Sequence, residues 1–288
     1  MNYQAPTSVE EAAGLLAADA DARVFAGATD WIPQLRAGRD EPSTLVDLKR
    51  IPRLVEHGKS DGSWTIGAAT PTSALTADAD LSADLPGLVE SAGLIGSDQI
   101  QNRASLGGNL CNASPAADSV PALIVNDAQA VVASGDGTRT VAVADIVTGP
   151  GSTSLGAGEF VVEFEVASPP AKTADAYLRF IPRTEMDIAV VGAAARVTLD
   201  DDGNCTSAAI ALAAVAPTVV RVPAAEEALA GSAIDDETLA AVAAAASEAC
   251  NPIDDKRGTK EFRRQVAGVL AKRAVLIAVE RAKNRGDA

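Results

Sequence analysis

The chain has 288 residues, of which 47% are hydrophobic and 22% charged, a balance typical of a globular protein. This length suffices for one large domain or two medium ones, and we expect two. The 24 basic and 39 acidic residues give a formal net charge of −15, which argues against nucleic acid or an anionic membrane as a partner.

The lack of a recognisable targeting signal and the scattered cysteines predict a cytoplasmic protein without membrane insertion. The first residues lack the basic and then apolar segments of a secretory signal, and no run approaches the roughly 20 apolar residues that span a bilayer. Cys111, Cys205 and Cys250 lie far apart in the sequence, so they predict neither a metal site nor a disulfide framework. We expect all three to be small, buried or half-buried side chains, and His57 to be structural or exposed.

The N-terminal residues predict a helix, a strand and a glycine-containing turn. Residues 7–18 have an apolar helical face, with Ser8 as the cap. A strand over residues 23–26 leads into the turn GATDW, residues 27–31, and then into a helical turn. A glycine turn between a strand and a helix can bind phosphate, because free backbone N–H groups converge there. The alternative is a plain connection between two elements.

The middle of the chain predicts strands over residues 43–48 and 63–68 and a helix over residues 85–96. The next stretch, residues 99–121, reads QIQNRASLGGNLCNASPAADSVP and has no long helical or strand periodicity. We therefore predict a loop against which a ligand lies. Gly107 and Gly108 would expose backbone N–H groups, and Ser105, Asn109 and Asn112 could add hydrogen bonds.

The second half of the chain predicts an antiparallel α+β unit after a boundary at Pro169 and Pro170. Before it, strands are expected over residues 128–133, 139–142 and 159–166. The first two would form a hairpin whose turn has Gly135 and Gly137 available for positive φ. Beyond the boundary, the patterns predict three strands and two helices, at residues 176–181, 189–199, 208–215, 236–250 and 260–282.

Basic residues gather near the C-terminus of this acidic chain. From Lys256 onward the sequence has ten basic and three acidic residues. They could form a docking surface for an acidic partner or the solvated face of an amphipathic helix. Nucleic acid is disfavoured, because no aromatic residues alternate with the charges.

Four segments together resemble the flavin-binding subunit of the molybdenum hydroxylases, the xanthine dehydrogenase and carbon monoxide dehydrogenase family. They are VFAGATDWIPQLRAG, IQNRASLGGNLCNASPAADSVPAL, RFIPRTEMDIAVVGAAARV and DDKRGTKEFRRQVAGVLAKRAV. The resemblance implies an α+β fold, with a two-lobed FAD-binding domain of the vanillyl-alcohol-oxidase (PCMH) type over residues 1–172. Its lobes would be about 1–55 and 56–172. A smaller α+β domain, with an antiparallel sheet and helices, would follow over residues 173–288.

The resemblance also implies where FAD binds, between the two lobes. The first turn would offer N–H groups to the pyrophosphate, Asp118 would bind toward the adenosine ribose, and Val161 would form an apolar wall. A cation at Arg179 would lie close to the flavin and could stabilise its reduced anion. The residues carried over in this way are Ala26, Gly27, Ala28, Thr29, Asp30, Trp31, Ser105, Gly107, Gly108, Asn109, Asp118, Val161 and Arg179.

The chain departs from the family pattern at two positions. The first motif is commonly AGGT, and here the second glycine is Ala28, which would cost about 1 kcal/mol if φ is positive. The second motif is commonly TIGG and here reads SLGG, a mild change. Gly107 and Gly108 would have no packing role without a ligand, so they are assigned to the cofactor.

Structural alternatives exist for the charged residues. Asp118 could cap a turn, and Arg179 could pair with Glu185 or Asp187 at the surface. Arg183 and Asp187 are expected to form a structural ion pair.

The family's division of labour implies a flavoprotein subunit without catalytic residues or a metal of its own. A large molybdopterin subunit would oxidise the substrate. A small [2Fe-2S] subunit would pass electrons to FAD and then to NAD, oxygen or a quinone, in what is expected to be a dimer of heterotrimers. The residues agree, because three scattered cysteines cannot ligate a four-cysteine cluster and no acid–base pair or nucleophile is visible. The alternatives are a stand-alone FAD-dependent reductase or oxidase and a non-catalytic nucleotide-binding assembly module.

Overall fold

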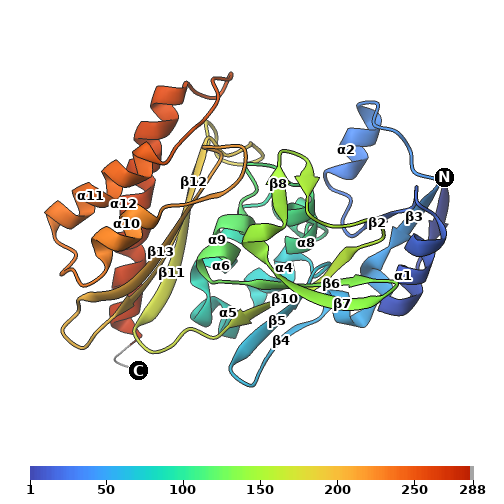
Figure 1. Cartoon of the computed structure of the whole chain (residues 1–288), viewed down its shortest axis with the longest axis horizontal. Helices are drawn as coiled ribbons and strands as arrows, with labels where there is room; N and C mark the ends of the chain where they lie inside the picture. Colours follow the sequence, from blue (N-terminus) through green and yellow to red (C-terminus); the bar gives the residue numbers. More distant parts are fainter. Residues whose placement is uncertain (286–288) are drawn as a thin grey trace.

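The computed structural model describes residues 1–285 and arranges them around three main sheets (Figure 1). An N-terminal lobe lies at one end of the molecule, a second lobe lies in the middle, and a C-terminal sheet with its helices lies at the other end. This mixed arrangement of helices and sheets confirms the predicted α+β class.

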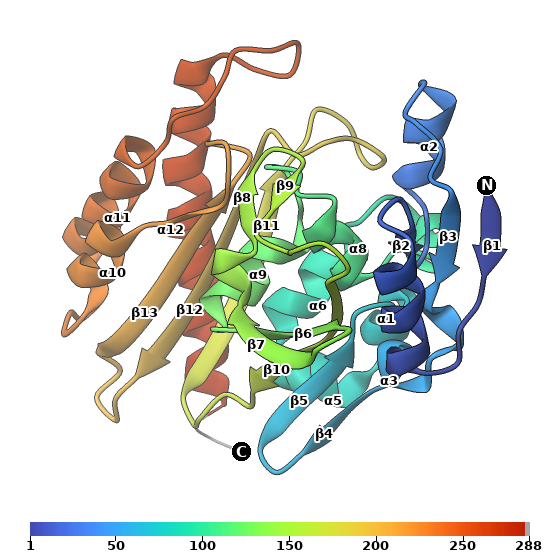
Figure 2. The same cartoon turned by 45° about the vertical axis from the view of Figure 1, so that its right-hand side comes forward.

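The N-terminal lobe is a small parallel sheet in the order β1-β3-β2 with α1 packed on it. Ser8 caps α1 as predicted, because its hydroxyl accepts a hydrogen bond of 3.1 Å from the Glu11 N–H. Helix α2 has no buried residue and projects away from the sheet (Figure 2). The elements are β1 (Asn2–Gln4), α1 (Val9–Ala18), β2 (Arg23–Phe25), α2 (Trp31–Arg36), β3 (Thr44–Asp47), η1 (Leu48–Arg50) and α3 (Pro52–Val55).

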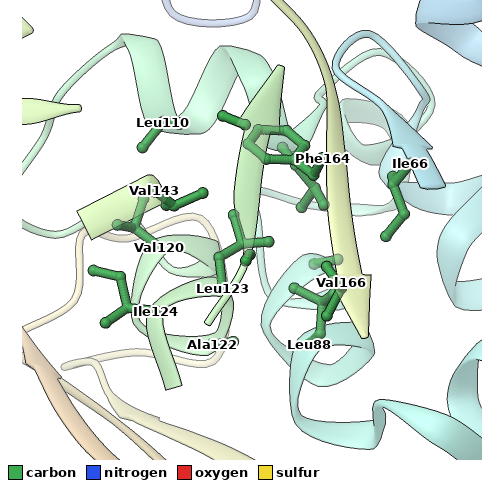
Figure 3. Close-up of a cluster of buried hydrophobic side chains, with 14 of the residues drawn as sticks. Ile66, Leu88, Leu110, Val120, Ala122, Leu123, Ile124, Val143, Phe164 and Val166 are labelled. Atoms are coloured by element: carbon green, nitrogen blue, oxygen red, sulfur yellow. The ribbon is translucent and has the colours of Figure 1, made fainter. Parts of the chain in front are cut away.

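The second lobe is a five-stranded antiparallel sheet in the order β4-β5-β10-β6-β7. Its core includes Leu88, Leu123 and Phe164, all fully buried (Figure 3). The strands are β4 (His57–Ser60), β5 (Ser63–Gly67), β6 (Gln129–Ser134), β7 (Gly137–Ala142) and β10 (Phe160–Ala167), with η2 (Val143–Asp145) and a side pair β8 (Val147–Gly149) and β9 (Ser152–Thr153). The predicted β6–β7 hairpin is confirmed, and of its two glycines Gly137 has positive φ, +122°.

The structure corrects the prediction of a continuous loop over residues 99–121. Three short helices occupy or overlap this stretch, each too short to produce a periodic pattern in the sequence. Ser105 caps the second of them by accepting a hydrogen bond of 3.2 Å from the Gly108 N–H. The helices of this lobe are α4 (Thr72–Ala77), α5 (Ala79–Asp84), α6 (Pro86–Gly93), α7 (Asp98–Gln101), α8 (Leu106–Cys111) and α9 (Ser119–Val125).

The C-terminal part is an antiparallel meander in the order β11-β12-β13-β14 with three helices, two of which were predicted. Helix α12 crosses α11 closely at Gly268, where a Cβ would lie 2.5 Å from the Ala243 carbonyl oxygen. The elements are β11 (Thr173–Phe180), β12 (Val191–Leu199), β13 (Cys205–Ala213), β14 (Val220–Arg221), α10 (Pro223–Leu229), α11 (Asp236–Glu248) and α12 (Lys260–Asn284). The sequence patterns did not predict α10, β14 or, in the N-terminal half, β1 and β4.

Strand β11 is fastened to the second lobe by a buried carboxylate. Asp175 is 2% exposed and accepts hydrogen bonds from the N–H groups of Gly87 (2.9 Å) and Leu88 (3.1 Å) and from the Asn126 side chain (2.7 Å). The three donors offset part of the desolvation of this carboxylate, and burial still raises its pKa. These hydrogen bonds therefore fix the position of β11 relative to the start of α6.

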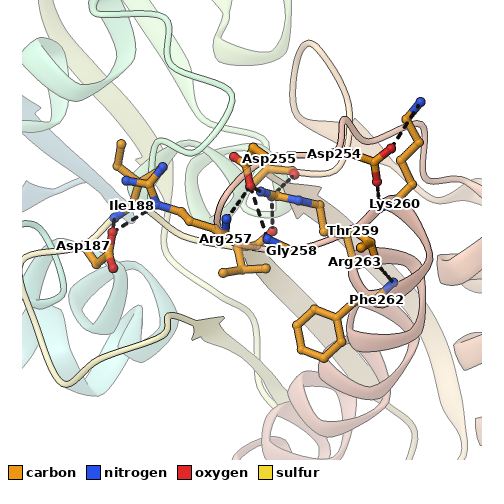
Figure 4. A network of polar contacts seen from close by, with 12 residues as sticks. Asp187, Ile188, Asp254, Asp255, Arg257, Gly258, Thr259, Lys260, Phe262 and Arg263 are labelled. Carbon is orange, nitrogen blue, oxygen red and sulfur yellow. Dashed lines mark hydrogen bonds and ion pairs between the residues drawn. The ribbon is translucent and has the colours of Figure 1, made fainter.

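A second polar network joins the loop after β11 to the start of α12 (Figure 4). Asp187 accepts a hydrogen bond of 3.1 Å from Arg257, and Asp255 accepts one of 2.8 Å from the buried Arg263. The expected pair between Arg183 and Asp187 is present at 3.6 Å, so Asp187 joins two arginines.

Candidate functional site

Segment 26–31 turns between β2 and α2 and has unused backbone donors. Among residues 1–285, no hydrogen bond has the N–H of residue 27, 28, 29 or 30 as its donor. Ala28 has a φ of +58°, the left-handed conformation that the sequence comparison with AGGT raised as a possibility. The segment therefore presents consecutive free N–H groups, the donor set that binds a phosphate.

Segment 105–109 begins α8 and lies against this turn. The close contact is made by Gly27, where a Cβ would lie 1.8 Å from the Arg103 carbonyl oxygen, a distance that no side chain can occupy. Segment 26–31 thus contacts the backbone directly before segment 105–109, although the two lie about 75 residues apart in the sequence. Gln34 of α2 adds a hydrogen bond of 2.9 Å to Asn112, just after α8.

The two segments line one cavity of about 510 Å³. Nine of the predicted site residues lie in its wall: Ala26, Gly27, Ala28, Thr29, Asp30, Trp31, Ser105, Gly108 and Asn109. Asn112 also lines it, as does Cys111, which is exposed and so differs from the buried or half-buried side chain that we expected. Cys205 and Cys250 are buried, as predicted.

The two neighbouring glycines of segment 105–109 have different roles in packing. A Cβ on Gly107 would lie 2.5 Å from the Ala68 carbonyl oxygen, so this glycine is required by the fold itself. The expectation that it has no packing role was wrong. A Cβ on Gly108 would meet only the Ser105 hydroxyl, at 3.3 Å, and Gly108 lines the cavity. Its missing side chain leaves room for a ligand.

Four predicted residues lie outside the cavity wall: Gly107, Asp118, Val161 and Arg179. Val161 is 4% exposed and packs in the core of the second lobe. Arg179 donates from Nη1 to Asp118 Oδ2 at 2.8 Å, and the side chain of Arg179 is 5% exposed. Both structural alternatives for this pair were wrong, because Asp118 makes no capping hydrogen bond and Arg179 pairs with neither Glu185 nor Asp187.

The Asp118–Arg179 pair is incompletely satisfied. Burial raises the pKa of Asp118 to about 6, although Arg179 and the hydroxyl of Tyr177 both lower it. The Nε of Arg179 is buried and, among the described residues, has no hydrogen-bond partner. A buried guanidinium with a spare donor fits an acceptor that is not part of the chain.

Two features of the site were missed by sequence reasoning. Lys49 donates from Nζ to the Ala26 carbonyl at 2.7 Å, and its ammonium lies 4.1 Å from the centre of the Phe25 ring, so it fixes the start of segment 26–31. Tyr177 donates to Asp118 Oδ1 at 2.8 Å. Neither residue belongs to a local motif. For Tyr177 the one signal in the sequence is its position two residues before Arg179 in a strand, which places both side chains on the same face.

The free N–H groups of residues 27–30 and the open space at Gly108 line one cavity and fit a large anionic ligand such as FAD. Arg179 Nε, outside the cavity wall, is a further buried donor without a partner among the described residues. Within residues 1–285, no group of three or more histidine, cysteine or acidic side chains is arranged to hold a metal ion. No helix in the same range is long and apolar enough to cross a bilayer.

Comparisons with known proteins agree with FAD as the cofactor of the chain. Residues 1–169 match the family model described as FAD binding domain in molybdopterin dehydrogenase, and residues 176–278 match the CO dehydrogenase flavoprotein C-terminal domain. The chain is 34% identical to the 6-hydroxypseudooxynicotine dehydrogenase complex subunit alpha of Paenarthrobacter nicotinovorans, over 98% of this chain and 95% of that one. It is 32% identical to the xanthine dehydrogenase FAD-binding subunit of Escherichia coli O157:H7, over 96% of each.

Solved structures share the fold over nearly the whole chain. A carbon monoxide dehydrogenase chain from Hydrogenophaga pseudoflava superposes with a TM-score of 0.93 at 34% identity, covering 98% of each chain. A chain of quinoline 2-oxidoreductase from Pseudomonas putida 86 does so with a TM-score of 0.91 at 31% identity, again over 98% of each. The predicted two-lobed fold is therefore confirmed, and the chain belongs to the FAD-binding subunits of the molybdenum hydroxylases, the family of carbon monoxide dehydrogenase and xanthine dehydrogenase.

Proposed function

We propose that this flavoprotein subunit carries electrons from the [2Fe-2S] clusters of a small partner subunit through FAD to an external acceptor. A large molybdopterin subunit would oxidise the substrate, and the complex would be a dimer of heterotrimers. The observation that carries the site assignment is the row of unused N–H groups at residues 27–30, which line the same cavity as Ser105 and Gly108.

When bound, FAD supplies the redox chemistry, by taking up electrons and passing them on. The chain's own residues bind and orient it. The N–H groups of segment 26–31 would hold the pyrophosphate, and Lys49 fixes this segment through the Ala26 carbonyl. Gly108 would let the cofactor approach the backbone of α8, while Ser105 keeps that helix start in place.

Asp118 and Arg179 would act from the other side of the cofactor. The positive charge of Arg179 would favour added electrons on the flavin, and its unpaired Nε could donate to a flavin acceptor. Asp118 contacts Arg179 and would partly offset that charge, in place of the adenosine-ribose contact that the resemblance implies. Val161 would contribute through packing, since it is buried in the core of the second lobe.

The chain's chemistry supports a division of labour between subunits. Its three cysteines are unpaired, and the described residues offer no cluster of metal ligands, so the iron–sulfur and molybdenum centres would lie in the partners. Free thiols also suit the reducing conditions of the cytoplasm, where we place the complex. We divide the chain at residue 172, because β10 belongs to the five-stranded sheet and β11 to the next one.

Purification of the tagged full-length chain from its native host tests this function. We expect FAD, iron and molybdenum to co-purify with two further polypeptides, and substrate-dependent reduction of the flavin to require all three subunits. A chain that retains FAD and turns over a substrate alone would instead be a stand-alone reductase or oxidase. A chain that never retains FAD would contradict the proposed site.

A further inference from the structure

We propose that Tyr177 and Gly192 are positioning residues: the Tyr177 hydroxyl, given room by Gly192, holds the Asp118 carboxylate against Arg179 and thereby sets the charge that this pair presents to the flavin. The inference rests on the proposed function, in which Asp118 and Arg179 act on FAD. It extends that function to Tyr177, which lies outside the four family segments given above, and to Gly192, which lies inside one of them but was given no role.

The two oxygens of Asp118 have separate partners. Oδ1 accepts from the Tyr177 hydroxyl at 2.8 Å, and Oδ2 accepts from Arg179 Nη1 at 2.8 Å. Both donors come from β11 and are two residues apart, so they project from the same face of the strand. Because Tyr177 is 2% exposed, its ring is held by packing and its hydroxyl has little freedom to move. The tyrosine thus determines which way the carboxylate faces.

Gly192 makes space for this hydroxyl. It lies on β12 directly opposite Arg179, and a Cβ there would lie 2.5 Å from the Tyr177 hydroxyl oxygen and 3.3 Å from Cζ. Gly192 is not among the glycines with positive φ, so its backbone conformation does not require glycine. A glycine inside a buried strand weakens the strand. The space that the Tyr177 hydroxyl needs therefore explains why residue 192 is a glycine.

The charge of the Asp118–Arg179 pair is sensitive to the hydrogen bond from Tyr177, because Asp118 gains or loses its proton near neutral pH. Burial raises the pKa of Asp118 to about 6, so loss of one donor to the carboxylate changes its ionisation near neutral pH. The titratable or charged groups that act on Asp118 within the described chain are Arg179 and Tyr177, both on β11. From α8, Asn109 is an uncharged neighbour whose amide oxygen accepts from Ser119. Burial and Asp118 keep Tyr177 neutral, because they raise its pKa well above the usual value.

Two variants of the full-length chain test the inference. Tyr177→Phe removes the hydroxyl and keeps the ring, and Gly192→Ala displaces the hydroxyl while keeping it in the chain. The matched control is Thr173→Val, which removes a buried hydroxyl hydrogen bond to Thr198 (2.9 Å) from the far end of the same strand. The first measurement is the pH titration of the Asp118 carboxyl carbon by NMR, assigned by the signal that Asp118→Asn removes. The second is the pH profile of the flavin midpoint potential.

We expect Tyr177→Phe and Gly192→Ala to raise the titration midpoint of Asp118 by about one pH unit, since a lost donor disfavours the carboxylate, and Thr173→Val to leave it unchanged. The inflection in the flavin potential should move in the same direction. An unchanged Asp118 titration in both variants overturns the inference, whether or not FAD is bound. A moved titration with an unmoved flavin profile overturns the link to the flavin. A wild-type chain without FAD contradicts the proposed function, and it does so independently of the NMR result.

Discussion

Gly27 and Arg103 bring the two halves of the cofactor site together, because the backbone of one passes directly against the carbonyl of the other. A Cβ at position 27 would lie 1.8 Å from the Arg103 oxygen. The contact joins the N-terminal lobe to the residues that precede α8. The first motif therefore needs a glycine here for packing between lobes, in addition to any need of the ligand.

Gly27→Ala should accordingly damage both the fold and the site. We expect a loss of about 3 kcal/mol in the free energy of unfolding, because backbone rather than a flexible side chain must move, together with loss of FAD. Urea denaturation and flavin absorbance measure the two effects. Gly14→Ala is the control, since Gly14 is exposed on α1 with no atom within 4 Å of an added Cβ, and it should stabilise by about 0.5 to 1 kcal/mol. Equal behaviour of the two variants would refute the argument.

Ala28→Gly should stabilise the chain. Ala28 has a φ of +58°, and glycine adopts this conformation without the steric cost of about 1 kcal/mol that a Cβ carries. We expect the melting temperature to rise by about 2 °C and FAD affinity to be at least maintained, because the free N–H groups remain in place. Thermal unfolding with and without FAD checks both. A lower melting temperature would show that the alanine side chain makes a contact that outweighs its strain.

Gly107→Ala and Gly108→Ala should separate folding from cofactor binding. The first places a Cβ 2.5 Å from the Ala68 oxygen and should cost about 2 kcal/mol of stability. The second meets only the Ser105 hydroxyl and should leave the stability of the flavin-free chain unchanged or slightly higher, while FAD affinity falls. Chemical denaturation and flavin fluorescence titration distinguish them. If Gly108→Ala binds FAD as the wild type does, α8 does not approach the cofactor at this residue.

Asp118 should make the folded chain less stable as pH rises. Its pKa is raised from 3.8 in the unfolded chain to about 6 in the folded one, so the folded state binds the proton more tightly. The stabilisation from this proton is fully present below about pH 4 and is lost as pH rises through about 6. Its full size is about 3 kcal/mol. The difference in unfolding free energy between wild type and Asp118→Asn, measured from pH 4 to 7, should change by most of this amount and then level off. A constant difference would contradict the raised pKa.

Arg263 should be essential for anchoring α12. It is 4% exposed and donates to the Val190 carbonyl at 2.6 Å, the Ala214 carbonyl at 3.1 Å and Asp255 at 2.8 Å. Arg263→Met removes the donor to the two carbonyls, while Asp255 keeps the N–H groups of Arg257 and Gly258, and should cost about 3 kcal/mol. The control Arg273→Ala removes an exposed arginine of the same helix and should change stability by less than about 0.5 kcal/mol. Urea denaturation of the two variants compares them, and a similar cost for both would contradict this anchoring role.

The sequence by itself determined the local elements and the family. Apolar periodicity and capping residues are properties of neighbouring positions, so α1, α12 and the three long strands β11, β12 and β13 could be predicted without tertiary information. The linked motifs around Gly27 and Gly108 identified a flavin-binding subunit for the same reason, because each is a short run of residues.

Only the tertiary structure decided what the individual residues of those motifs do. Gly107 and Gly108 are equivalent in the sequence, yet one packs on Ala68 and the other borders the cavity, because distant segments surround them differently. Asp118 and Arg179 are 61 residues apart, and their pairing depends on how β11 lies against the second lobe. Long-range packing sets such contacts, and no local pattern encodes them.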